Sequence, residues 1–397
     1  MHKLITTTLL VLFVGLIACK KKTEDTSVAD KQTQQKQEVV ANYANIVQAT
    51  YQDALSKAQI LKTTINDFIA NPTDAKFTAV KNAYIDARTP YEQSESFRFY
   101  GGPIDDDVTG VEGLLNSWPM DEGYIDYIVG YPNSGIINDP VTHPTINKDT
   151  LEALNSVGSE TNISVGYHAI EFLLWGQDLS ATGPGARPYT DYVTGGTGTA
   201  SNQDRRGAYL KACAELLVQH LQTVADAWAP NADNYRKAFI AAPADSSLRK
   251  IFLGIGSFSK GELAGERMSV ALSTQEQEEE HSCFSDQTDV DIKLGAKSIQ
   301  NVWTGKYIKA DGTVIQGTSL STLVASYNAQ FGGQLDTQID ETVQACNAVQ
   351  HPFDQQILGT NPTGRANIQT AIDKLKTLGD MFVTGAAALG ITNVTIQ

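Results

Sequence analysis

The sequence predicts a mainly α-helical fold with one small β-hairpin, and two patterns carry this prediction. Apolar residues recur at three- and four-residue steps over 40–68 and again over 209–228, the spacing of a helix that buries one face. Only the segment 302–317 has strand character, because two β-prone runs there flank the turn Ala310–Thr313. With 397 residues, 41% of them hydrophobic and 19% charged, the chain is long and apolar enough for two or three folded domains.

The other elements follow in order from the same spacing and from residues that stop helices. Asn71-Pro72 ends the first long helix. The segment 101–147, rich in Gly, Pro, Asp and Asn, is expected to form loops with short helices, and 176–206 a long ordered loop. Further helices are expected over about 74–99, 164–175, 232–240, 246–274, 319–348 and 364–388.

The two ends of the chain share a layout. A long helix pair with a Pro-containing break spans 43–88, and a second one spans 327–389. This repetition suggests two related helical bundles that arose by duplication. We expect the first bundle at approximately 37–200 and the second at approximately 201–397.

The N-terminus has the features of a bacterial export signal. Lys3 precedes the apolar run Leu4–Ile17, whose 14 residues are too few to span a bilayer. The run ends in Leu16-Ile17-Ala18-Cys19, which resembles the lipobox of bacterial lipoproteins. We therefore expect residues 1–18 to be a signal peptide, Cys19 to carry lipid, and the polar residues 19–36 to form a flexible tether. Lys20 after the cysteine favours the outer membrane over the inner one, so the expected location is the bacterial cell envelope, periplasmic or surface-facing.

Charge and cysteine content exclude several function classes. Asp and Glu outnumber Lys and Arg by 45 to 30, and the net charge of −15 repels phosphate backbones. We therefore expect no nucleic-acid partner, whereas an acidic surface suits a protein that handles cations. After export, at most one disulfide can form among Cys213, Cys283 and Cys346, and the sequence leaves the pairing open. No CxxC pair supports a thiol-redox role or a cysteine zinc site.

The segment 166–178 holds the most informative pair of polar residues. His168 and Glu171 are three positions apart, so on a helix both side chains face one site. An imidazole nitrogen with a carboxylate oxygen suits iron, zinc or manganese, and a helical bundle can complete such a site with carboxylates from facing helices. A structural hydrogen bond between the two side chains inside the bundle is the alternative, and the spacing alone leaves both open.

The chain resembles the imelysin family. The family signature GxHxxE is matched by Gly166, His168 and Glu171. Further imelysin-like segments follow in family order at 97–101, 116–119, 170–176, 185–192, 204–210, 265–268 and 280–286. The resemblance implies an all-α fold of two helical bundles with a cleft between them, near which the signature helix lies. It also implies an exported or membrane-attached bacterial protein. Because some members are named as peptidases and others are iron-regulated or belong to iron-uptake systems, the resemblance leaves both function classes open.

The resemblance also selects further candidates for the site. Glu95 and Glu112 are the preferred partners of His168 and Glu171 at the metal, because they flank the family-like segment 97–100. On helices, Glu92 and Glu95 would share one face, as would Glu262 and Glu266, and these glutamates are further candidates. Residues expected to line the cleft are Arg98, Glu262, Arg267, His281, Ser282 and Asp286. For each of these residues the alternative is a solvated surface group or a structural ion pair.

Three functions remain open from the sequence. We expect first a protein that binds a metal ion or metal complex, with iron as the favoured metal, and supports iron uptake together with transport components. The second is a metallopeptidase using zinc, but HExxH and GxSxG are absent, and an inverted HxxEH would need His where the chain has Phe172. The third is a surface module that binds a peptide or an organic ligand, with His168 and Glu171 purely structural.

Overall fold

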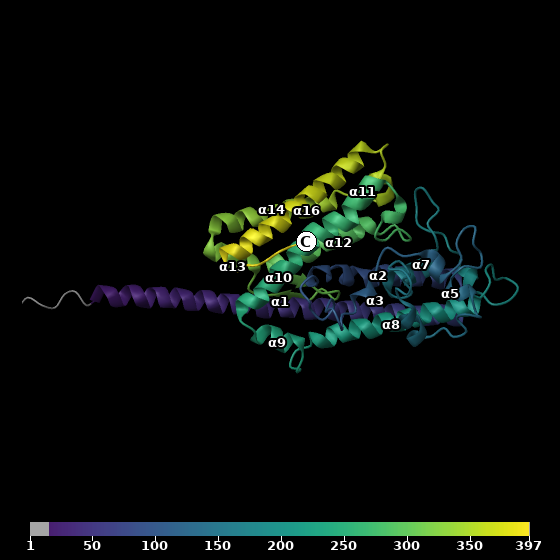
Figure 1. The fold of residues 1–397 in the computed structure, drawn as a ribbon, viewed down its shortest axis with the longest axis horizontal. Helices are drawn as coiled ribbons and strands as arrows, with labels where there is room; N and C mark the ends of the chain where they lie inside the picture. The colour runs from purple at the N-terminus through teal and green to yellow at the C-terminus, as the bar shows by residue number, and fades with distance from the viewer. Residues whose placement is uncertain (1–15, 397) are drawn as a thin grey trace, which may run out of the picture.

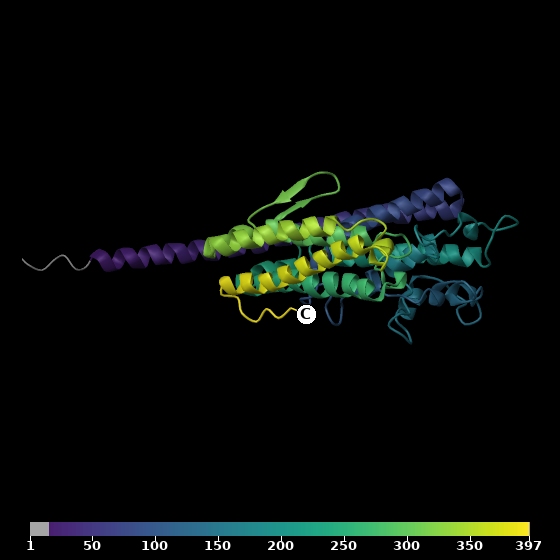
Figure 2. The same ribbon diagram turned by 90° about the horizontal axis from the view of Figure 1, so that it is seen from above.

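The computed structural model describes residues 16–396, with side chains from residue 30 onward. Its first helix, α1 (Leu16–Ala70), is so long that its N-terminal part projects beyond the rest of the molecule (Figures 1 and 2). The segment 19–36, expected to be a flexible tether, is instead a continuous part of this helix. Lys36 binds Asp245 at 2.6 Å and the Leu389 carbonyl at 3.0 Å, so the end of this segment is held against the body of the protein.

The described part of the chain has no disulfide and no helix suited to crossing a membrane. Cys213, Cys283 and Cys346 are all buried free thiols. None of the described helices is both long and apolar enough to span a bilayer. Most of the expected signal peptide, residues 1–15, lies outside the described residues, and the lipid on Cys19 stays a prediction.

A first bundle forms around the C-terminal half of α1. α2 (Asp74–Glu92) begins at Thr73, whose hydroxyl accepts the Lys76 amide, and packs along α1. α7 (Gly166–Trp175) and α8 (Gln203–Ala227) complete the bundle, since α8 packs against both α1 and α7. α8 thus packs with the first bundle, although the sequence analysis placed residues from 201 onward in the second. The segments in between hold only short helices: η1 (Glu95–Phe97), α3 (Glu112–Leu115), α4 (Glu122–Ile125), α5 (Gly135–Asn138), α6 (Lys148–Leu154) and η2 (Tyr189–Tyr192).

The second bundle contains the C-terminal helices. One continuous helical stretch consists of α10 (Ala244–Ser257), η3 (Phe258–Ser269) and α11 (Val270–Thr274), of which η3 is a π-helix. Against it pack α12 (Thr288–Thr304) and α16 (Pro362–Ala388). These two helices in turn contact α13 (Leu320–Tyr327) and α14 (Ala329–Asn347). The short elements α9 (Tyr235–Ala241), η4 (Gln277–Glu279) and α15 (Phe353–Ile357) lie between these helices in the sequence. Because α1 also contacts α10 and α13, one helix runs through both bundles (Figure 1).

The hairpin is shorter than the sequence predicts. β1 (Lys306–Ile308) pairs antiparallel with β2 (Val314–Gln316) over three residue pairs. Residues 302–304 are instead the last residues of α12. The sequence analysis did not predict this helical end, because residues 302–317 are β-prone in composition. Gly305, at a φ of +64°, stops that helix before the hairpin begins. The expected helix 319–348 is divided into α13 and α14.

The fold class is confirmed as all-α with one small hairpin. One hydrophobic core runs through both bundles. Where the bundles meet, α2 packs against α7 on one side and α12 on the other, and these helices bring buried polar side chains together inside the core. The candidate site lies at this junction.

Candidate metal centre

α7 carries the signature histidine and glutamate into the interior. Every residue of this helix is buried, including His168 and Glu171. Gly166 starts the helix at a φ of +91°, and a Cβ there would lie 2.7 Å from the Leu115 carbonyl oxygen. Glycine therefore allows the chain to turn into α7 this close to the end of α3. The glycine of the motif positions the helix, and the helix positions the two side chains.

His168 and Glu171 form a hydrogen-bonded pair. His168 Nδ1 lies 3.1 Å from Glu171 Oε2, and since a carboxylate only accepts, Nδ1 carries the hydrogen. Glu171 also accepts the Ser285 amide at 3.0 Å, the Ser285 hydroxyl at 2.6 Å and the Tyr84 hydroxyl at 3.3 Å. His168 Nε2 is left with a lone pair, buried and without a hydrogen-bond partner among the described residues. Histidines that ligate metals are held in this way, with the second ring nitrogen bonded to a carboxylate.

His281 repeats this arrangement from another part of the chain. Its Nδ1 lies 2.8 Å from Asp291 Oδ2, which also accepts the Ser282 hydroxyl at 2.6 Å. Its Nε2 faces the Asn116 amide nitrogen at 3.5 Å, a weak contact. The His168 and His281 rings meet edge to face, with their centroids 4.8 Å apart. Two imidazoles, each fixed by a carboxylate at Nδ1, thus share one buried site.

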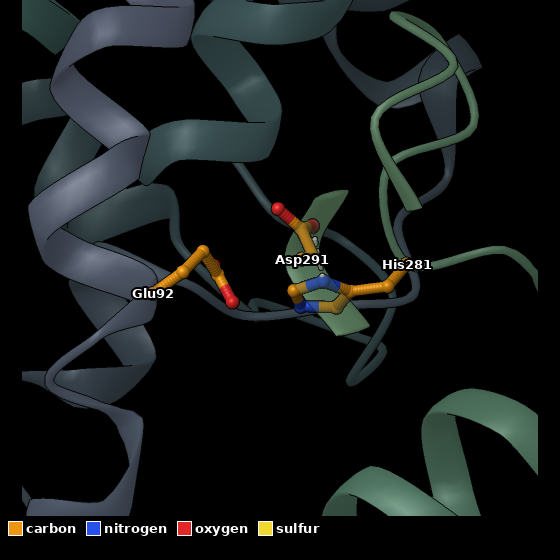
Figure 3. A group of neighbouring side chains, drawn as sticks. All are labelled: Glu92, His281 and Asp291. Atoms are coloured by element: carbon orange, nitrogen blue, oxygen red, sulfur yellow. Dashed lines mark hydrogen bonds and ion pairs between the residues drawn. The ribbon is translucent and has the colours of Figure 1, made fainter. Parts of the chain in front are cut away.

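Glu92 completes the group of potential ligands. Figure 3 shows its carboxyl group directed at the His281 ring, which Asp291 contacts from another side. One ligand atom from each of Glu92, His281 and Asp291 lies within 4.8 Å of the other two. Within the described part of the chain, no other three histidine, cysteine or carboxylate side chains gather this closely.

Burial sets the protonation of these groups. It lowers the pKa of His168, and together with Arg267 and His168 it holds the pKa of His281 well below the usual value. Both imidazoles are therefore neutral at pH 7, the form that binds metals. Burial, and after it Asp291, raises the pKa of Glu92 to about 8, so this carboxyl group holds a proton at neutral pH that a bound cation would displace.

Arginines neutralise part of the carboxylate charge beside the histidines. Arg88 bridges Glu92 at 2.5 Å and Asp291 at 2.9 Å, and Arg267 reaches the second Glu92 oxygen at 3.2 Å. In the whole cluster six carboxyl groups face three guanidinium groups: Glu92, Glu95, Glu112, Glu171, Glu262 and Asp291 against Arg88, Arg98 and Arg267. This shortage of positive charge favours the entry of a cation.

The arginine-rich half of the cluster contains Glu95 and Glu112, the two glutamates expected as metal ligands. Arg98 binds Glu95 at 2.7 Å and Glu112 at 3.0 Å, and Arg267 binds Glu95 as well. Burial opposes ionisation of Glu95, but Arg98 and Arg267 outweigh it and lower the pKa of this residue. In the structure, Glu95 and Glu112 therefore belong to the cluster as ion-pair partners of arginine. The carboxylates beside His281 are instead those of Glu92 and Asp291.

The remaining candidates divide between the cluster and its surroundings. Glu262 binds Arg267 at 3.0 Å, whereas Glu266 is exposed. Only Glu262 of this expected pair therefore reaches the cluster. Asp286 is buried but lies outside the cluster.

Three members of the cluster escaped sequence reasoning: Arg88, Asn116 and Asp291. Arg88 donates to the Asn116 side-chain oxygen at 3.0 Å and so connects α2 to the end of α3. Asp291 lies on α12, which the sequence analysis did not predict. A signal for that helix exists, since apolar residues recur there at helical spacing: Ile292, Ala296, Ile299 and Trp303.

The donor set fits a transition metal that accepts nitrogen and oxygen ligands. Two neutral imidazoles and several carboxylates suit iron, manganese or zinc. Cys283 is nearby in the sequence, but burial keeps the pKa of its thiol well above the usual value, so it is a poor ligand. His168, Glu171, Glu92 and Asp291 are at most 2% exposed, so an ion enters only through local opening. A surface pocket of about 220 Å³ lies elsewhere, between residues 127–129 and 176–188.

Comparisons with known proteins agree on one family. The family model described as Imelysin matches residues 47–381. Iron-regulated protein A of Synechococcus elongatus is 24% identical over 344 residues, which make up 84% of this chain and 81% of that protein. A protein described as an iron-regulated protein A precursor from Parabacteroides distasonis shares the fold with a TM-score of 0.69 and 18% identity, over 91% of this chain and 96% of that one. An imelysin-like protein from Psychrobacter arcticum does so with a TM-score of 0.63 and 14% identity, over 90% and 96%.

Proposed function

The chain belongs to the imelysin family, and from this premise we propose that it is a lipoprotein of the bacterial envelope that binds a metal ion or metal complex. Iron is the favoured metal, and support of iron uptake, together with transport components, is the proposed role. The lipid on Cys19 would hold the protein at the membrane, the outer membrane before the inner one. The name of the Synechococcus elongatus relative supports a link to iron at the level of the family.

One observation carries the proposal: the buried, unpartnered Nε2 of His168. A polar atom removed from water without a partner is unfavourable, and a bound ion would remove that cost. The Glu171 carboxylate fixes the ring so that this nitrogen, and not Nδ1, is the free one. In this proposal His168 binds the metal through Nε2, and the neighbouring group of Glu92, His281 and Asp291, with one ligand atom of each within 4.8 Å of the other two, supplies the remaining ligands.

The arginines explain how the protein stays folded without the ion. Arg88 and Arg267 bind the carboxylates beside the histidines and supply positive charge there. A metal ion competes with them for the same oxygens, which limits its affinity and makes release feasible. A carrier that must pass its metal to a transporter needs such reversible binding.

The metallopeptidase alternative has less support from the site. The residues around His168 are buried, whereas a peptide substrate must reach the metal. Glu171 accepts three hydrogen bonds besides its contact with His168, so it is not free to act as a general base. Cleavage of unfolded casein that stops when a chelator is added, or when His168 is replaced, would favour the peptidase instead.

Calorimetric titration of the purified protein tests the proposal. Ferrous iron, ferric citrate, manganese and zinc are titrated into the wild type, His168→Ala and Glu171→Gln. We expect saturable iron binding that weakens at least 100-fold in His168→Ala and about 10- to 100-fold in Glu171→Gln, because the carboxylate acts through the ring it orients. Far-ultraviolet circular dichroism should show unchanged helix content.

His220→Ala is the matched control. His220 is also a buried histidine with a lowered pKa caused by burial, but it lies on α8 beside Glu152, outside the cluster. The His220→Ala variant should therefore bind iron with the affinity of the wild type. Equal iron affinity in the wild type and both cluster variants would exclude this site.

A further inference from the structure

The two histidines of the cluster are enclosed by helices and by two irregular segments. α2, α7 and α12 form regular walls, and the segment 280–286, which carries His281, is buried throughout. The second segment is the loop 116–120, which lies between α3 and α4. Only its first residue, Asn116, is buried, and Pro119 is exposed. This loop is therefore the irregular part of the wall that solvent reaches.

Two side chains of this loop lie against His281. The Asn116 amide nitrogen is 3.5 Å from His281 Nε2, and the Trp118 ring meets the His281 ring edge to face, with the centroids 5.7 Å apart. The His281 ring in turn contacts that of His168. Trp118 is half-buried, whereas both histidines are buried. Its indole therefore covers the pair of imidazoles from the outside.

The loop is fixed at both ends and weakly held between them. Leu115 before it is buried, and the Asp121 amide after it donates to the Thr161 carbonyl at 2.7 Å. Between these ends, no amide of residues 117–120 donates a hydrogen bond to any group of the described chain. Segments with few main-chain hydrogen bonds open at a lower free energy than the surrounding helices. The loop can therefore move while both bundles stay folded.

The arginine-rich half of the cluster also reaches solvent, at the half-buried Glu112 and Glu262. Arg98 binds Glu112 at 3.0 Å, and Arg267 binds Glu262 at 3.0 Å. A cation that entered there would pass two guanidinium groups of the same charge sign, which repel it. The loop 116–120 contains no charged residue, and the face of an indole ring attracts cations. Electrostatics therefore favour entry on the side of the loop.

We propose that the loop 116–120 is the gate through which a metal cation enters and leaves the cluster, and that Trp118 holds this gate closed. The proposal rests on the proposed function and adds the route to the site. When Asn116 and Trp118 turn outward between the fixed ends of the loop, the His281 ring and the free Nε2 of His168 become accessible. Because Trp118 is not a ligand, its loss should change the rates of binding and release together.

Acylation by diethyl pyrocarbonate tests the gate without any metal. The reagent attacks neutral imidazole, and when opening and closing are fast, the rate at a buried histidine follows the fraction of open molecules. Trp118→Ala should raise the acylation rates of His281 and His168 by about tenfold, because an aromatic contact and the area it covers are lost. Trp118→Phe keeps an aromatic ring at this position and should stay close to the wild type. Mass spectrometry of the peptides measures each histidine separately.

Two controls separate opening of the loop from general loosening of the fold. His220 is buried outside the cluster, and its acylation rate should be the same in every variant. Val108→Ala, at an exposed position before α3, should change no histidine. An equal rate at His281 in the wild type and Trp118→Ala would overturn the proposal. A rise at His220 as large as that at His281 would overturn it as well.

Stopped-flow measurement of ferrous iron binding adds the kinetic test. Trp118→Ala should accelerate association and dissociation by the same factor and leave Kd within about threefold of the wild type, since the gate is closed in both the free and the bound protein. A weaker Kd with an unchanged association rate would show that Trp118 stabilises the bound ion and is not a gate. If the wild type binds no iron, the proposed function fails, and acylation of His281 still decides whether the loop opens.

Discussion

In the histidine cluster, the surroundings of each residue determine its hydrogen-bond partner and the direction of its pKa shift. His168 finds its carboxylate three residues away on one turn of α7, whereas His281 finds Asp291 only because the chain folds back at α12. Glu92 and Glu95 both contact arginine, yet the pKa of Glu92 is raised and that of Glu95 is lowered. The difference arises because Asp291 adds negative charge beside Glu92, and the arginines outweigh burial only at Glu95.

Gly166→Ala should destabilise the protein by about 2 kcal/mol or more. The substitution places a Cβ 2.7 Å from the Leu115 carbonyl oxygen and forces a side chain onto a backbone at a φ of +91°. Gly333→Ala, in the second turn of α14, is the matched control, because nothing lies within 4 Å of its added Cβ. That control should gain about 0.5–1 kcal/mol from helix propensity. Urea unfolding measures both, and equal stabilities would mean that the glycine of the motif does not position α7.

At the scale of elements, η3 is the helix that completes the cluster. Its π-helical spacing brings Glu262 and Arg267, five residues apart, to the same side, and Arg267 reaches η1 and α2 from there. π-helical turns often mark functional sites. An α-helix over the same residues would pair Glu262 with Glu266 and would turn Arg267 away from Glu92 and Glu95.

Arg267→Met should lower the free energy of unfolding by about 3–5 kcal/mol, because it leaves buried carboxylates without their counter-charge. Adding Glu95→Gln to that variant should restore at least half of the loss, since the uncompensated charge is removed as well. Lys260→Met on the same helix is the control, because Lys260 forms an exposed pair with Asp380 worth about 0–1 kcal/mol. Unfolding in urea gives all four values. A double variant no more stable than Arg267→Met would show that Arg267 acts through packing and not through charge.

At the scale of the whole molecule, part of the acidic balance of the chain is buried. The net charge of −15 includes the carboxylates around the histidines. These carboxylates lie where α2 packs against α7 and α12, so the negative charge that the arginines leave uncompensated opposes the packing of these helices. The apoprotein should therefore respond to pH as a whole, and bound cations should stabilise it.

The metal-depleted protein should lose stability as pH rises from 5 to 8. Folded protein holds the Glu92 proton up to a pKa of about 8, whereas the unfolded chain releases it near the ordinary value of 4.5. The stabilisation is therefore complete below about pH 4.5 and declines toward pH 8, by at most about 1.4 kcal/mol per pH unit for this group. Glu92→Gln should flatten the profile, and the exposed Glu276→Gln should not. Chemical unfolding at several pH values measures the free energy of unfolding. A wild-type free energy that rises from pH 5 to 8 would contradict the raised pKa of Glu92.

The sequence by itself determined the helical class, the hairpin turn, the family and the pair His168–Glu171. These features depend on local spacing: apolar periodicity, a glycine at a helix start and two polar residues three apart. The same locality explains the errors. Residues 302–304 are β-prone by composition but end α12, and residues 19–36 are polar but continue α1, because neighbouring helical turns outweigh the preference of a short segment.

Only the tertiary structure decided which carboxylates accompany the histidines. Position along the chain does not state whether a glutamate contacts arginine or imidazole. The family-like segment 97–100 favoured Glu95 and Glu112, which contact arginines in the folded chain, whereas Glu92 and Asp291 lie beside His281. Charge interactions act through space and grow with burial, so the properties of these groups exist only once both bundles have packed.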